Sequence, residues 1–204
     1  MTKRRIGLAM MLLGVLAIAA GLGLGGYNLW DSRRAGIEAD AALESIVQHR
    51  EETEADPDAF YEIPLDFQWE LPVLEIDGRR YIGTLSIPAI DVELPVQEDW
   101  SLSLLKASPC RYMGSPYQGG MIVCAHNYAT HFGRLKNLLP GDEVLFTDVE
   151  GNVFPYTVVK LEDLAGTAVE EMESGEWDLT LFTCTLGGQA RVTVRCQLAE
   201  DALG

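Results

Sequence analysis

The chain has 204 residues, 48% of them hydrophobic, which is enough for a membrane anchor and one packed domain of ordinary size. The formal net charge is −16, and because three basic residues precede the first acidic one, residues 31–204 carry 12 basic and 31 acidic side chains. This balance excludes a nucleic-acid-binding surface, since neutralising phosphates requires clustered lysine and arginine.

An uncharged, mainly apolar run extends from Ile6 to Trp30 and exceeds the roughly 20 residues needed to cross a bilayer core. The basic residues before it predict that residues 1–5 are cytoplasmic and that the rest of the chain lies outside the cell. A cleaved signal peptide is the alternative, because Ala17-Ile18-Ala19 resembles a small-residue cleavage site. The run continues well past that site, so we expect a single-pass transmembrane signal anchor at residues 6–30.

Residues 31–79 are expected to form a membrane-proximal helix followed by a linker. Up to about residue 53 the sequence is charged and alanine-rich, and its larger apolar residues are spaced for one narrow helical face: Ile37, Leu43, Ile46 and Val47. From residue 54 to about 75, three prolines and many acidic residues argue against a compact element.

Residues 80–204 form a domain in which short β-type runs alternate with turn residues. Seven runs have strand length and β-branched or aromatic content: Tyr81–Ile87, Val92–Val96, Gly120–Cys124, Glu143–Thr147, Val153–Leu161, Leu179–Cys184 and Arg191–Leu198. Short helices are expected at Ser101–Ala107 and Phe132–Leu139. Seven or more short strands with few helices imply a closed or sandwich-like, mainly β domain.

The last two predicted strands are separated by Gly187-Gly188, a two-residue loop typical of a β-hairpin with a primed turn. In that register Cys184 faces Arg191, and directly opposed residues have Cβ atoms roughly 4.5–5.5 Å apart. A thiol beside a guanidinium favours the thiolate or binds a developing oxyanion. Arg195 falls about 13 Å further along the strand and is therefore excluded.

A cysteine nucleophile needs a proton-transfer partner, usually histidine, and the chain has three histidines. His126 ends an apolar run, where a buried strand emerges into a loop, which is a common place for a reactive side chain. His131 follows five residues later and is the alternative, whereas His49 belongs to the membrane-proximal helix. A lone strand cysteine is more often inert core, so the hypothesis of a cysteine enzyme depends on the conjunction of the thiol, the arginine and a histidine.

The remaining cysteines are Cys110, Cys124 and Cys196. Their spacing is not typical of a disulfide framework, and no Cys or His spacing matches a zinc site, so neither a metal nor another cofactor is expected. We expect Cys184 to be a free thiol, and Cys124 and Cys196 to be small buried hydrophobic residues.

Five stretches, in order along the chain, resemble one known family, the sortases, which are membrane-anchored cysteine transpeptidases of Gram-positive cell surfaces. Thr180-Leu181-Phe182-Thr183-Cys184 matches the family's Thr-Leu-x-Thr-Cys signature in every fixed position. The other matching stretches are Arg191-Val192-Thr193-Val194, Ala125-His126-Asn127, Phe132–Leu139 with Pro140-Gly141-Asp142, and Leu85–Ile90 with Leu94-Pro95-Val96. The family's histidine is often preceded by glycine, where this chain has alanine. The resemblance covers roughly residues 80–198 and the N-terminal anchor.

The resemblance implies a closed eight-stranded β-barrel with short helices and an active site in a groove. It implies that Cys184 attacks the backbone carbonyl after the threonine of a C-terminal Leu-Pro-x-Thr-Gly-like sorting signal, and that an amine resolves the thioacyl intermediate. His126 would protonate the leaving amine and then deprotonate the incoming amine. Arg191 would bind substrate carbonyl oxygens or the oxyanion, and Thr183 would help to shape the substrate-binding site.

The partners that the resemblance implies are the sorting-signal peptide of secreted surface proteins and an amine acceptor, either a peptidoglycan precursor or a pilin lysine. Two other readings stay open. A hydrolytic cysteine peptidase would use the same groups with water as the acceptor. A membrane-tethered β-barrel binding module would have no activity.

Overall fold

The structure is a computed structural model that describes residues 2–54, 71–185 and 187–199. The chain divides into two compact units, Met1–Arg34 and Ala35–Gly204. The linker expected from residue 54 to about 75 lies mostly outside the described residues. The cysteine, histidine and arginine singled out from the sequence all belong to the second unit.

The first unit is the N-terminal part of α1 (Thr2–Glu54), a helix of 53 residues. Its large apolar side chains between Ile6 and Trp30 are exposed. Within the described part of the chain, α1 alone is long and apolar enough to cross a membrane. The N-terminal segment is therefore a candidate membrane anchor, as the sequence predicts.

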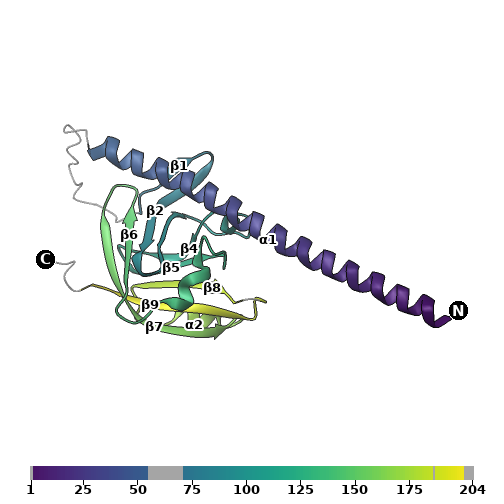
Figure 1. The fold of residues 1–204 in the computed structure, drawn as a ribbon. Coiled ribbons are helices and arrows are strands. Elements are labelled where there is room, and N and C mark those ends of the chain that lie inside the picture. The colour runs from purple at the N-terminus through teal and green to yellow at the C-terminus, as the bar shows by residue number, and fades with distance from the viewer. Residues whose placement is uncertain (1, 55–70, 186, 200–204) are drawn as a thin grey trace. The chain divides into compact units, whose positions relative to one another are not determined.

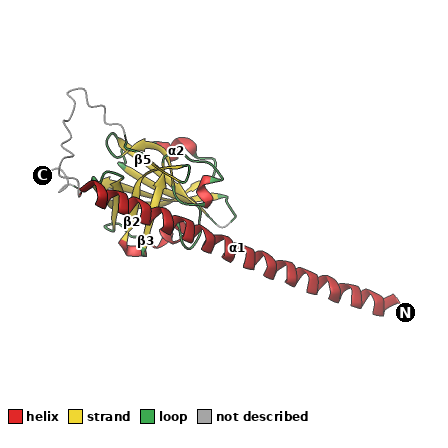
Figure 2. Ribbon diagram, turned by 90° about the horizontal axis from the view of Figure 1, so that it is seen from above, coloured by secondary structure: helices red, strands yellow, loops and turns green. Residues whose placement is uncertain are grey.

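The second unit is mainly β (Figures 1 and 2). Its strands are β1 (Leu74–Ile76), β2 (Arg79–Ile87), β3 (Val92–Gln97), β4 (Cys110–Ser115), β5 (Gly119–Ala125), β6 (Glu143–Asp148), β7 (Val153–Ala165), β8 (Leu179–Cys184) and β9 (Ala190–Leu198). The short helical elements are η1 (Pro88–Ile90), η2 (Leu104–Lys106), η3 (Phe132–Asn137) and α2 (Val169–Glu173). All seven predicted strands are present, whereas β1, β4 and α2 were not predicted.

Eight of these strands close into a ring. The strand order is β2-β3-β4-β5-β8-β9-β7-β6, and β6 pairs back onto β2, while β1 pairs with the start of β2. Gly83 permits this closure, because a Cβ at that position would lie 2.2 Å from the backbone oxygen of Thr147. The eight-stranded closure expected from the sequence is confirmed.

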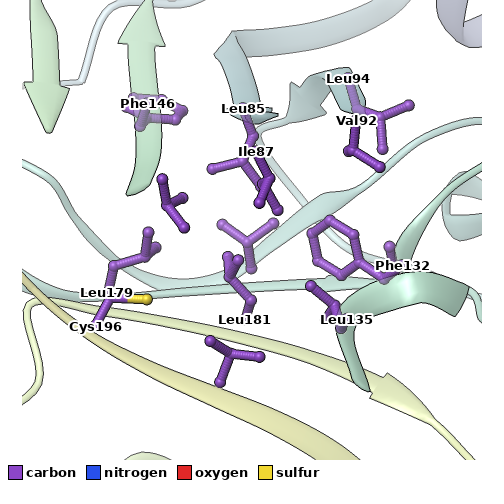
Figure 3. Close-up of a cluster of buried hydrophobic side chains, with 14 of the residues drawn as sticks. Leu85, Ile87, Val92, Leu94, Phe132, Leu135, Phe146, Leu179, Leu181 and Cys196 are labelled. Atoms are coloured by element: carbon purple, nitrogen blue, oxygen red, sulfur yellow. The ribbon is translucent and has the colours of Figure 1, made fainter. Parts of the chain in front are cut away.

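Alternate residues of the strands fill the interior of the ring. The central cluster includes Leu85, Phe132, Phe146 and Leu181, all fully buried (Figure 3). Val123 and Ala125 on β5 belong to it, as do Leu179 and Leu181 on β8. Because successive side chains of a strand point to opposite faces, Cys124 on β5 and Phe182 and Cys184 on β8 lie on the outer face of the ring.

The C-terminal part of α1 packs within the second unit through a stripe of three alanines and one isoleucine. The buried members of the stripe are Ala35, Ala39, Ala42 and Ile46. Of the larger residues predicted to form an apolar face, Ile46 is buried, whereas Ile37 is 70% exposed and Val47 is also exposed, so the prediction is only partly right. Alanine side chains let the helix backbone approach the domain closely, which larger side chains would prevent.

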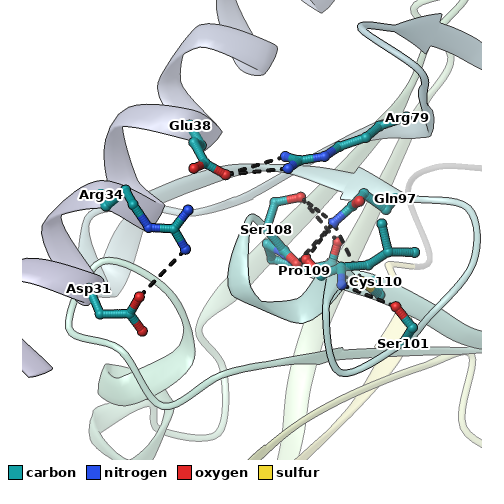
Figure 4. A network of polar contacts seen from close by, with 10 residues as sticks. Asp31, Arg34, Glu38, Arg79, Gln97, Ser101, Ser108, Pro109 and Cys110 are labelled. Carbon is teal, nitrogen blue, oxygen red and sulfur yellow. Dashed lines mark hydrogen bonds and ion pairs between the residues drawn. The ribbon is translucent and has the colours of Figure 1, made fainter.

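Polar contacts also join this part of α1 to the strands. Arg50 Nε donates to the backbone oxygen of Asp148 at 2.8 Å, and its Nη2 donates to the backbone oxygen of Thr147 at 2.7 Å. Glu38 accepts hydrogen bonds from both terminal nitrogens of Arg79, each at 3.4 Å (Figure 4). Residues 35–50 are therefore a structural part of the β unit.

Candidate active site

The β8–β9 hairpin places a thiol directly opposite a guanidinium. The register pairs Cys184 with Arg191, as the sequence predicts. Thr185 N donates to Ala190 O at 2.9 Å, and Gly188 N donates to Thr185 O at 2.8 Å. Gly187 and Gly188 both have positive φ, 92° and 73°, which glycine adopts without strain.

His126 lies near Cys184 because the strands that precede the two residues are paired in parallel. β5 and β8 run side by side, with Ala125 paired to Thr183. His126 and Cys184 each follow that pair, so both lie at the carboxyl ends of neighbouring strands, which are about 4.8 Å apart in a sheet. Thr183 Oγ1 donates to Ala125 O at 2.8 Å and fixes the two strand ends to each other.

A cavity of about 230 Å³ lies on the outer face of the ring, and His126, Cys184 and Arg191 all line it. Its walls are mainly apolar and come from the strands, from the connection before β4 and from the connection between β7 and β8: Trp100, Leu102, Leu105, Tyr112, Cys124, Ala125, Ala165, Gly166, Ala168, Val169, Met172 and Phe182. The structure therefore brings three of the four residues singled out from the sequence to one cavity. Thr183 is buried and is not part of the lining, and its role in substrate binding stays a prediction.

Arg191 is held by its own hairpin. Its Nη1 donates to Gly188 O at 3.0 Å and to Ala190 O at 3.2 Å. A guanidinium has five N–H donors, and within the described residues the Nε and Nη2 groups of Arg191 donate no hydrogen bond. These groups are suited to bind a carbonyl oxygen or an oxyanion in the cavity.

The second arginine of this strand has a structural role. Arg195 is 2% exposed and pairs in register with Thr180, away from Cys184 along the hairpin. Its side chain donates to Glu162 Oε1 at 3.0 Å and to Met172 O at 2.8 Å. The bond to Met172 O attaches α2, one wall of the cavity, to the sheet.

Cys184 is the one described cysteine that is not buried, and all four cysteines are free thiols. Burial raises the pKa of Cys124 and that of Cys196 to about 12, and it also raises the pKa of Cys110. A buried thiol of that kind is not a nucleophile at neutral pH, because the thiolate is the reactive form. Cys124 and Cys196 are buried, as expected from the sequence.

The two loop histidines differ in their surroundings. His126 is half-buried and faces the cavity, whereas His131 is fully buried. Burial, together with the nearby His126, lowers the pKa of His131 to about 4. His131 is therefore neutral at physiological pH and has no access to the cavity.

The wall that contains Trp100 and Leu105 is held from inside by Gln97, which is 1% exposed (Figure 4). Its Nε2 donates to Leu104 O and to Ser108 Oγ, both at 2.9 Å. The sequence predicts a short helix at Ser101–Ala107 but not its place in this wall, because these residues meet β5 and β8 only through the closure of the ring. Among the described residues, no group of three or more His, Cys, Asp or Glu is arranged to hold a metal ion.

The comparisons with known proteins agree with this fold. A family model described as Sortase domain matches residues 85–199, more than half of the chain. No curated protein matches by sequence. Sortase C1 from Streptococcus agalactiae is 19% identical, with a TM-score of 0.61 over 76% of this chain and 98% of that chain. Sortase A from Listeria monocytogenes is 21% identical, with a TM-score of 0.55 over 59% of this chain and 88% of that chain. Sortase C from Streptococcus pneumoniae is 22% identical, with a TM-score of 0.54 over 78% of this chain and 89% of that chain.

Proposed function

The chain belongs to the sortase family, and from that premise we propose that it is a membrane-anchored cysteine transpeptidase with Cys184 as its nucleophile. The observation that supports this best is that the thiol, an imidazole and a guanidinium line one cavity. His126 is the proton-transfer group and Arg191 the oxyanion-binding group. Thr183 contributes to the substrate site by holding the ends of β5 and β8 together.

The reaction has two steps with one covalent intermediate. The Cys184 thiolate attacks the scissile carbonyl carbon, and the carbon–nitrogen bond breaks while His126 gives its proton to the leaving amine. An acceptor amine then attacks the thioacyl carbon, His126 takes a proton from it, and the thiolate leaves. Arg191 binds the oxygen that carries negative charge in both tetrahedral states.

The substrate is a C-terminal Leu-Pro-x-Thr-Gly-like sorting signal on a secreted surface protein. The apolar lining of the cavity suits the apolar part of such a peptide. The acceptor is the amine of a peptidoglycan precursor or of a pilin lysine. The N-terminal anchor would hold the enzyme at the outer surface of a Gram-positive cell, where these amines are found. In this proposal residues 1–5 are cytoplasmic, 6–30 span the membrane, 31–79 form the membrane-proximal segment and 80–204 form the extracellular catalytic domain.

The proposal is tested with the full chain in lipid nanodiscs, a library of sorting-signal peptides and two amine acceptors, triglycine and a lysine peptide. Mass spectrometry should detect a thioacyl adduct on Cys184 and a peptide ligated to one of the amines. Cys184→Ala should remove both, lowering turnover by at least about a thousandfold. Cys110→Ala is the matched control, because it replaces a buried thiol outside the cavity.

The two alternatives predict other products. A hydrolytic peptidase yields the free acid whichever amine is present. A non-catalytic binding module gives neither adduct nor product, and that result from the wild-type chain would refute the proposal.

A further inference from the structure

The loop that begins with His126 is tightly closed. Phe132 N donates to His126 O at 3.2 Å, so the backbone of His126 is tied to a residue of the central hydrophobic cluster. Inside the loop, His131 N and Gly133 N both donate to Tyr128 O at 3.0 Å. We refer to residues 126–133 as the histidine loop. Its backbone bonds leave little freedom for one end to move without the other.

The rings of the histidine loop extend from the cavity into the interior. The rings of His126 and Tyr128 have centroids 4.9 Å apart, and those of Tyr128 and His131 are 5.4 Å apart. His131 is 0% exposed. The His126 ring is therefore the outer member of a row of tilted rings whose inner end is buried, and its orientation depends on that row.

The inner end of the histidine loop lies against α1. Ala35 is 0% exposed, and Ala39, at 1%, belongs to the same cluster as Phe132. Gly36 lies so close to the loop that a Cβ on it would be 3.1 Å from Thr130 Cγ2. The floor beneath the histidine loop thus consists of Ala35, Gly36 and Ala39, and a Cβ at Gly36 would press on Thr130.

We infer that the segment 35–39 of α1 is a positioning element for His126, which it acts on through Thr130, His131 and Phe132. This inference rests on the proposed function. A side chain added on the floor pushes the histidine loop away from the helix and turns the His126 ring relative to Cys184. The thiol and Arg191 are carried by the β8–β9 hairpin, a different element from the histidine loop, so we expect substrate binding to be left intact.

The test uses a graded series at Gly36 in the full chain. Gly36→Ala favours the helix by about 1 kcal/mol through intrinsic propensity, so a loss of activity would not come from a weaker helix. Gly36→Leu places a larger side chain against Thr130 and should displace the histidine loop further. Gly26→Ala is the matched control, since the same helix has nothing within 4 Å of a Cβ at Gly26.

We expect kcat to fall about threefold in Gly36→Ala, where Thr130 must move by a few tenths of an ångström, and up to about a hundredfold in Gly36→Leu, where the displacement approaches about 1 Å, with KM within twofold of the wild type. The limb of the kcat/KM–pH profile that reports the histidine should also shift. Thr130→Ser removes the methyl group that a Cβ would meet, so Gly36→Ala/Thr130→Ser should recover most of the lost kcat.

A second measurement does not require activity. In the full chain in micelles, labelled with ¹³C at histidine Cε1, the His126 signal should move in Gly36→Leu while the His49 signal stays. If kcat, the pH profile and the His126 signal all equal those of Gly26→Ala, the inference is overturned. If the His126 signal moves but the wild-type chain has no transpeptidase activity, the positioning role stands and the proposed function fails.

Discussion

Buried His131 makes the stability of the protein depend on pH over a defined window. Burial lowers its pKa from 6.5 to about 4 in the folded state. In the unfolded chain the same side chain takes up a proton as the pH falls through 6.5. The contribution of neutral His131 to the free energy of unfolding is therefore fully present above pH 6.5 and is lost progressively between pH 6.5 and 4.

The size of the loss follows from the two pKa values. They differ by about 2.5, and each pKa unit corresponds to about 1.36 kcal/mol, so the free energy of unfolding falls by about 3 kcal/mol when the pH is well below 4. At pH 5 the loss is already about 2 kcal/mol relative to pH 8, since most of the unfolded chains then carry the proton.

The prediction is tested by comparing the wild type with His131→Phe, which keeps an aromatic ring beside Tyr128 but does not titrate. Guanidinium-induced unfolding of the full chain in detergent, followed by tryptophan fluorescence at pH 8, 6.5 and 5, gives the free energies. The wild type should lose about 2 kcal/mol more than the variant between pH 8 and 5. Contributions from carboxylates cancel in the difference. Equal losses in the two proteins would refute the conclusion that His131 is buried in its neutral form.

Two further substitutions test the site itself. Arg191→Ala should lower kcat in the nanodisc peptide assay by about a hundredfold or more, because an oxyanion donor is lost. Substitution of the exposed Arg80 by alanine is the control and should leave kcat unchanged. Equal effects of the two substitutions would contradict the assigned role of Arg191. Thr183→Val removes the hydroxyl donor to the buried Ala125 oxygen and should lower the free energy of unfolding by about 1–3 kcal/mol. Thr183→Ser keeps the hydroxyl and should retain most of the wild-type stability. A Thr183→Val protein of wild-type stability would show that the hydroxyl does not hold the strand ends.

The hairpin could be predicted from the sequence because it is local. Two glycines and two alternating strands determine which residues face each other, so Cys184 and Arg191 were paired and Arg195 was excluded. Spacing could not separate His126 from His131, because the parallel pairing of β5 with β8 joins segments 58 residues apart. That pairing and the burial of His131 distinguish the two.

Other features depend on packing that no local pattern encodes. β4 was not predicted because it lacks a regular alternation of buried and exposed residues. Its pairing with β5 is interrupted twice, at Arg111/Met113 and Met113/Ser115. α2 has only five residues, too few for a helical period to appear. The docked face of α1 consists of three alanines and Ile46, and hydrophobic periodicity weighs alanine less than the exposed Ile37.

The reacting groups and the walls of the cavity come from different kinds of structure. Cys184, Arg191 and the strand end before His126 belong to the hydrogen-bonded ring, whereas Trp100, Leu102 and Val169 come from the connection before β4 and from α2. Under the proposed function, substitutions in those two segments would alter the choice of peptide while the reacting groups are retained. The buried side chains of Gln97 and Arg195 set the limit on such changes, because they bond to the backbone of the same segments.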